Sequence, residues 1–331
     1  MNGINLKKVT LPFILLCLFF LPAVIRSPYY FHTLNMTLIY IIAASSLRTI
    51  ALSGQISIAH AAFMAVGAYV SAILAKYLGW SPWVTIPMGG IAGMLAGVLV
   101  GYPLVRVRAI YFSMVSLFSG MAIVALIGVC QTYTGGDAGL IGIPPLPAID
   151  LPWLPKIVFV TSKVNQYYFF LLLTMACLFF LHRVETSRTG TNWSAISQSY
   201  LVASSVGINE AKYRVMALAV GCFFAGIAGA CYAHYTMTLT SSTFGFLPSI
   251  NLLIYVLVGG VGNFFGPVIG TAVLVIIPET FRWLKEYVPF IFGGIMLIVA
   301  FLMPQGISGL VTQIKERIHR NSKNGEVVHR A

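Results

Sequence analysis

The sequence VTIPMGGIAGMLAGVLVGYPLV at residues 84–105 decides the fold. It runs for 22 residues without a charged side chain, which is long enough for an α-helix to cross about 30 Å of hydrocarbon. Similar apolar runs recur along the chain: of its 331 residues, 58% are hydrophobic and only 8% are charged. Alternating strands of about ten residues, typical of a membrane barrel, are not visible. The sequence therefore predicts an all-α fold, a polytopic transmembrane helix bundle.

We expect about ten membrane segments along the chain. They lie near residues 11–26, 34–52, 56–77, 84–105, 109–130, 167–182, 214–236, 247–262, 266–283 and 288–304. The segment at 56–77 is rich in glycine, alanine and serine, so part of it is expected to be re-entrant or unwound, as buried backbone allows.

The basic residues indicate how the segments are oriented. With both chain ends in the cytoplasm, 13 of the 20 lysines and arginines fall on the cytoplasmic side, as the positive-inside rule requires. Their scatter between apolar runs argues against nucleic-acid binding, despite a net charge of +12. We expect a membrane domain at 1–310, with an outer loop at 131–166 and a cytoplasmic loop at 183–213 long enough for one or two short helices, and a basic cytoplasmic tail at 311–331.

Small residues at four-residue spacing predict close helix packing. One ladder contains Gly89, Gly93, Gly97 and Gly101, and a second contains Gly221, Ala225, Gly229 and Ala233. Residues at this spacing share one face of a helix, so two backbones can approach each other there.

Few polar residues lie within the predicted segments, and such residues are candidates for function. Arg48 is expected either to line a solute path, or to pair with backbone carbonyls or snorkel. His60 is expected either to serve that path or to be a core histidine bonded to backbone. Glu279 is expected to pair with Arg282 on its own helix. The remaining candidates for the path are polar or glycine residues at possible helix breaks near the middle of the membrane: Gly54, Gln55, Ser57, Gly259, Gly260 and Gly262.

Motifs of enzymes and cofactor sites are absent from the sequence. It contains no phosphate-binding loop, no H-E-x-x-H, no G-x-S-x-G and no C-x-x-C pair. We therefore expect no cofactor, no metal site and no ATPase activity of the chain itself. A secondary transporter working alone is a weaker alternative, because it would need coupling acids within the bundle.

Six blocks of sequence resemble the branched-chain amino acid ABC transporter permease family. They are LSGQISIAHAAFMAVGAYVSAIL (52–74), RVRAIYFSMVSLF (106–118), TGGDAGLIGIP (134–144), SRTGTNWSAI (187–196), VGINEAKYRVMALAVGCFFAGIAGACYAH (206–234) and PSINLLIYVLVGGVGNFFGPVIGTAV (248–273). The resemblance implies a permease subunit in a bacterial inner membrane that imports amino acids. Related permeases for urea and other amides share these blocks, so the solute stays open.

The resemblance also implies partners: a second permease subunit, two cytoplasmic ABC ATPases and a periplasmic solute-binding protein. It identifies the loop with the element that couples to the ATPase, through residues Ala195, Ile196, Ala203, Ser204 and Gly207. A glycine at 207 suits a left-handed helix cap.

The sequence departs from the family pattern at several positions. Thr191, Ser194 and Ser197 stand where the family usually has basic residues, and Ser204 lies near an acidic position. Asp137 stands where the family tends to carry a small neutral residue, which implies a different contact at the outer loop.

Overall fold

The computed structural model describes residues 27–280, apart from 105–106, 108, 149–158 and 160–161, together with a few single positions toward either end. Within these residues the regular structure is helical apart from one short ribbon, so the all-α class is confirmed. The ribbon joins β1 (Leu140–Ile141) to β2 (Thr238–Leu239) in antiparallel register, with Leu140 opposite Leu239. The basic tail at 311–331 lies outside the described residues.

The helices vary in length. The long ones are α2 (Pro28–Ala51), α4 (Pro82–Leu104), α5 (Ala109–Val129), α7 (Lys163–Glu185) and α10 (Glu210–Thr236). The shorter ones are α3 (His60–Tyr77), α6 (Gln131–Thr134), α8 (Arg188–Gln198), α9 (Tyr200–Ser205), α11 (Phe246–Gly259) and α12 (Gly266–Thr280), with single 3-10 turns at η1 (Gly136–Ala138) and η2 (Ser241–Phe244).

Six helical stretches are long and apolar enough to cross a membrane. They are Pro28–Ala51, Pro82–Leu104, Tyr111–Val129, Lys163–Glu185, Glu210–Thr236 and Ser241–Gly259. Two further expected segments are the shorter helices α3 and α12. The expected segments at 11–26 and 288–304 lie outside the described residues apart from single positions, so the count of ten stays a prediction.

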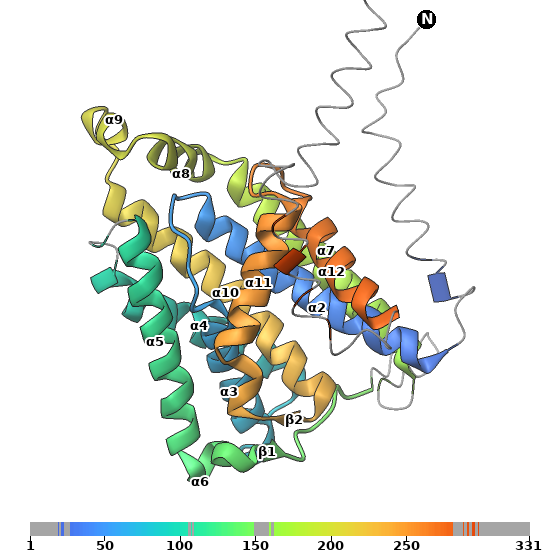
Figure 1. Cartoon of the computed structure of the whole chain (residues 1–331). Helices are drawn as coiled ribbons and strands as arrows, with labels where there is room; N and C mark the ends of the chain where they lie inside the picture. The colour runs from blue at the N-terminus through green and yellow to red at the C-terminus, as the bar shows by residue number, and fades with distance from the viewer. Residues whose placement is uncertain are drawn as a thin grey trace, which may run out of the picture.

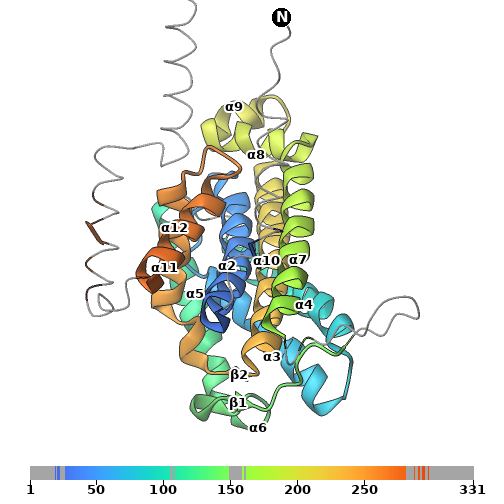
Figure 2. The same cartoon turned by 90° about the vertical axis from the view of Figure 1, so that its right-hand side faces the viewer.

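The bundle has two distinct ends. Helices α8 and α9 lie across one end, whereas α6 and the β1–β2 ribbon close the opposite end (Figures 1 and 2). Helix α5 stands at the edge of the bundle in Figure 1. The predicted pair of short helices in the loop at 183–213 is therefore present, at the end opposite the ribbon.

The segment between α2 and α3 is not helical. It runs from the α8 end back into the bundle before α3 begins at His60 (Figure 1). Two serines of α5 satisfy its backbone: the Ile58 N–H donates to the Ser116 hydroxyl at 3.1 Å, and the Ser113 hydroxyl donates to the Ile56 carbonyl at 2.7 Å. Irregular backbone at membrane depth needs such partners, because lipid offers none.

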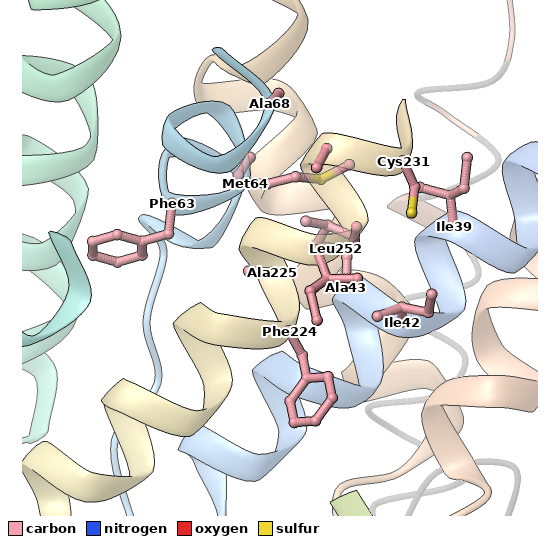
Figure 3. Close-up of a cluster of buried hydrophobic side chains, with 14 of the residues drawn as sticks. Ile39, Ile42, Ala43, Phe63, Met64, Ala68, Phe224, Ala225, Cys231 and Leu252 are labelled. Carbon is pink, nitrogen blue, oxygen red and sulfur yellow. The ribbon is translucent and has the colours of Figure 1, made fainter. Parts of the chain in front are cut away.

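Helix α10 occupies the centre of the bundle. Its apolar side chains meet those of α2, α3 and α11 in one cluster, which includes Ile39, Met64, Ala225 and Leu252 (Figure 3). Phe63 of α3 is also buried there. The centre is therefore built largely from small and branched apolar residues.

Glycines allow α10 to approach α3 and α4 at backbone contact. Gly226 of α10 lies directly against Gly67 of α3 and Gly89 of α4, with no space for a methyl group at any of them. A methyl group on Gly93 would lie 2.5 Å from the Cys222 carbonyl oxygen.

The other ladder glycines also face neighbouring helices. A methyl group on Gly97 would lie 2.5 Å from the Cys222 sulfur, and one on Gly101 would lie 2.7 Å from a Leu218 methyl. Gly221 faces Ile50 of α2, and Gly229 lies against the Met64 carbonyl of α3. Both ladders therefore lie where helix backbones approach each other.

Replacing Gly93 or Gly97 with leucine should destabilise the bundle. The added side chain meets the α10 backbone at Gly93 and the Cys222 side chain at Gly97, and overpacking of this kind costs about 1–3 kcal/mol. We expect a lower thermal midpoint and a lower yield of detergent-purified protein. Leu99→Phe is the control, since Leu99 on the same helix is 78% exposed. Equal loss in all three variants would contradict the packing assignment.

Candidate functional site

Arg48 forms a buried ion pair at the last turn of α2. Its Nη1 lies 2.6 Å from each carboxylate oxygen of Glu185, the last residue of α7. Its Nε donates to the Val261 carbonyl at 2.8 Å, and its guanidinium lies over the Phe264 ring. The arginine thereby connects the ends of α2 and α7 to the turn between α11 and α12.

The structure places two of the candidates for the solute path in this region. Arg48 donates from Nε to the Val261 carbonyl and from Nη1 to Glu185, which agrees with the structural pairing given as the alternative to a path-lining role. The break between α11 and α12 lies beside Arg48 and Glu185, where α2 and α7 also end. A buried arginine needs a counter-charge and hydrogen-bond acceptors, and these are available where helices end.

Three glycines of the α11–α12 turn have different roles. Gly259 lies against the Gly266 carbonyl, so it allows the two helices to pack closely. Gly260 adopts a φ of 97°, which a residue with a side chain rarely adopts. A methyl group on Gly262 would meet nothing within 4 Å. In the described part of the chain, no backbone hydrogen bond links any of the three glycines to Gln55, Ser57 or His60.

Helix α8 is anchored to three other elements. Gly190 lies against the Glu185 carbonyl, which fixes the bend between α7 and α8. The fully buried Trp193 donates its indole N–H to the Tyr213 carbonyl of α10 at 2.8 Å. A methyl group on Gly54, in the unwound segment, would lie 3.3 Å from Ser197 Cα. Helix α8 therefore contacts both the ion-pair junction and the unwound segment.

Helix α9 ends in a glycine cap. The Gly207 N–H donates to the Ser204 carbonyl and the Ile208 N–H to the Ala203 carbonyl, each at 3.0 Å, with Gly207 at a φ of 86°. This is the Schellman arrangement, which stops a helix and reverses the chain. Gly207 is thus left-handed, as its position in the sequence suggested.

The surface of α9 is apolar and exposed. Leu201, Val202 and Val206 are each more than 60% exposed. Of the residues expected to couple, Ser204 and Gly207 are exposed and Ala195 is half-buried, whereas Ile196 and Ala203 are buried beneath this surface. The two short helices therefore combine a buried anchor with an exposed apolar face.

Several buried polar atoms near the unwound segment lack a partner. The His60 Nε2 pairs with the Ser46 hydroxyl at 2.8 Å. The His60 Nδ1, both polar atoms of the Gln55 amide and the Ser57 hydroxyl have no hydrogen-bond partner within the residues the structure describes. Each unpaired polar group costs about 1–3 kcal/mol when buried. Such a concentration in one short segment is therefore typical of a site that meets a polar ligand.

The remaining acidic candidate has a structural contact. The Tyr29 hydroxyl donates to a Glu279 carboxylate oxygen, which links α2 to α12. Arg282, the expected partner of Glu279, lies outside the described residues. Across the part of the chain that the structure describes, no three or more histidine, cysteine or acidic residues gather as metal ligands do.

Sequence reasoning missed Glu185, which completes the Arg48 junction. The chain contains only 8 acidic residues, so a buried arginine had few possible counter-charges. Glu185 comes three residues after the predicted segment 167–182, on the side where the predicted segment 34–52 also ends. That position was the available signal.

Glu185→Gln should destabilise the protein strongly. Removing one partner of a buried pair leaves the other charge unpaired, at a cost of about 3–5 kcal/mol. We expect a lower thermal midpoint, partly restored by adding Arg48→Met, because the double variant leaves no unpaired charge. Lys212→Gln is the control, since it also removes one charge but at an exposed position. Additive losses in the double variant would contradict the pairing.

Comparison with known proteins gives a consistent assignment. The family model described as branched-chain amino acid transport system, permease component, matches residues 29–300. The high-affinity branched-chain amino acid transport system permease protein LivM of Escherichia coli is 28% identical over 88% of this chain and 72% of its own length. Its counterpart in Salmonella typhimurium is 29% identical over 82% and 68%.

A second kind of relative is more distant. The permease protein LivH of Salmonella typhimurium is 22% identical over 77% of this chain and 86% of its own length. No solved structure matches the chain. Because the family model covers most of the sequence, from the start of α2 to residue 300, the chain belongs to the family of branched-chain amino acid transport system permease components.

Proposed function

We propose that this chain is the membrane-spanning permease subunit of an ABC importer that moves amino acids, branched-chain ones in particular, across a bacterial inner membrane. The observation that carries the proposal is the α8–α9 pair, which joins an exposed apolar face to the interior of the bundle. The names of the LivM and LivH relatives support the solute class.

The importer needs further subunits. A second permease of the LivH kind completes the membrane part, two cytoplasmic ABC ATPases supply energy, and a periplasmic binding protein delivers the solute. The exposed face of α9, with Leu201, Val202 and Val206, suits an apolar groove of the ATPase. Apolar contact matches a loop whose family basic positions hold Thr191, Ser194 and Ser197. The α8–α9 end is then cytoplasmic, with both chain termini on that side.

Movement of the ATPase reaches the solute path through α8. Trp193 holds α8 to the start of α10, and Gly190 holds it to the end of α7. A shift of α8 therefore acts on the Arg48–Glu185 junction and, through Ser197 and Gly54, on the unwound segment. That segment carries Gln55 and Ser57 and leads into His60, whose unpaired polar atoms offer hydrogen bonds to a zwitterionic solute.

Uptake by the assembled complex tests the proposed function. Proteoliposomes containing both permeases and both ATPases should accumulate leucine, isoleucine or valine only when ATP and loaded binding protein are present. Urea in the same panel distinguishes an amide importer from an amino-acid importer. Accumulation without ATP, or of urea alone, would overturn the assignment.

Gly207→Val tests the coupling role of α9. A methyl group at Gly207 meets nothing within 4 Å, so the substitution acts through the backbone alone, at about 1–2 kcal/mol of local strain. We expect normal membrane insertion but loss of the stimulation of ATP hydrolysis by loaded binding protein. Gly207→Asn should keep it, because asparagine tolerates a positive φ.

Gly79 provides the matched control for this experiment. It has a φ of 68° and open space around it, but it follows α3 at the ribbon end of the bundle. Gly79→Val introduces the same strain far from α9, so stimulated hydrolysis should persist. Unchanged stimulation in Gly207→Val would contradict the coupling assignment.

A further inference from the structure

A groove of about 540 Å³ opens along the inner side of α5. It lies between α5, the start of α3 and the start of α11, and its size is within the range of small-molecule sites. Its walls are mostly apolar: Ile58, Leu117, Met121, Val124, Phe244 and Phe246. Such walls suit the apolar body of a small solute.

Polar groups line the ribbon end of the groove. Asp137 and Gln131 come from the turn after α5, and Ser241 comes from η2. The Ser241 hydroxyl donates to Asp137 Oδ1 at 3.2 Å, which orients the carboxylate. Among the described residues no lysine or arginine forms an ion pair with Asp137. A lone carboxylate therefore faces the groove in a chain with a net charge of +12.

Ser249 adds an independent sign of a ligand. It lines the groove and is only 4% exposed, yet its hydroxyl has no hydrogen bond within the described part of the chain. It also lies in the first turn of α11, whose N–H groups and dipole favour a negative group. A buried hydroxyl in that setting is suited to bind an anionic oxygen of a ligand.

We propose that this groove is a binding subsite for a zwitterionic solute with an apolar side chain, selected by its ammonium group at Asp137. The carboxylate is bound at Ser249 and the first turn of α11, and the apolar side chain lies along Met121 and Phe244. The proposal rests on the function proposed above and deepens it. It also assigns a role to Asp137, the residue at which the sequence departs from the family pattern.

Charged thiol reagents test the subsite in the assembled transporter. Val129 lines the groove beside Gly128, whose added methyl would lie 3.4 Å from Asp137 Oδ1. Met121 lines the groove about two turns of α5 away from Val129. Val129→Cys and Met121→Cys are made with Cys130→Ser, because Cys130 is the exposed one of the four described cysteines. Each variant is treated with a methanethiosulfonate reagent that carries either a cationic trimethylammonium group or an anionic sulfonate group. The labelling rate of each reagent is divided by its rate with a small free thiol in solution.

The carboxylate should attract the cationic reagent. At Val129→Cys we expect the cationic-to-anionic rate ratio to fall at least about tenfold when Asp137→Asn is added, the lower range of focusing by a charged cleft. The fall should be smaller at Met121→Cys. Tyr133→Phe, on α6 but outside the groove, should leave the ratio unchanged. An unchanged ratio in Asp137→Asn overturns the proposal.

Protection by solute tests the chemistry of the ligand. Leucine should slow the labelling of Met121→Cys, whereas 4-methylpentanoate, which lacks the ammonium group, should not, and Asp137→Asn should abolish protection by leucine. Equal protection by leucine and 4-methylpentanoate overturns the proposal. Failure of both introduced cysteines to react also overturns it, because the groove is then covered by another subunit. If uptake is driven by ATP but the labelling rates show no preference for the cationic reagent, only the subsite proposal is overturned. If the labelling shows the charge preference and leucine protects, but no uptake occurs, only the importer proposal is overturned.

Discussion

The close approach of α10 to α3 and α4 is the contact on which the rest of the bundle depends. At Gly67, Gly89 and Gly226 three helix backbones meet without side chains between them. Lipid gives helices no hydrophobic reason to associate, so packing at this distance supplies much of the attraction. Because α10 is fixed there, its first turn is fixed too, and the Tyr213 carbonyl can hold Trp193 of α8. The packing of the interior thus sets the position of a surface helix.

Polar groups in this protein are few, and their placement shows where the bundle departs from simple helices. Where the backbone unwinds between α2 and α3, hydroxyls of Ser113 and Ser116 satisfy it. Where the charge of Arg48 is buried, Glu185 neutralises it and the Val261 carbonyl accepts a hydrogen bond from it. Around Gln55, Ser57 and His60 the compensation is incomplete within the described residues, and the largely buried Ser249 lines the α5 groove. These two places are where solute chemistry is expected, because an unpaired buried group gains most from a ligand.

The two ends of the bundle carry different chemistry. The α8–α9 end presents aliphatic side chains and a glycine cap, which suit a protein partner that moves a helix. The ribbon end presents Asp137, Gln131 and two serines around a groove, which suit a small polar solute. The unwound segment contacts both regions, since Gly54 lies against α8 and Ile58 lines the groove. A displacement of α8 therefore has a short physical route to the proposed solute path.

The sequence by itself determined the helical class, the approximate ends of α4 and α5, and the four-residue glycine spacing, because these depend on local composition and helical period. It also indicated an unwound part within 56–77, without its place, and a cap at Gly207, where glycine and small residues interrupt the pattern. Only the tertiary structure decided that Arg48 pairs with Glu185, 137 residues away, and that the α11–α12 turn lies at this junction. It alone placed Asp137 and Ser249 in one groove. A hydrophobic pattern shows which residues avoid water, but it does not specify which helix faces meet, and these sites lie between helices distant in sequence.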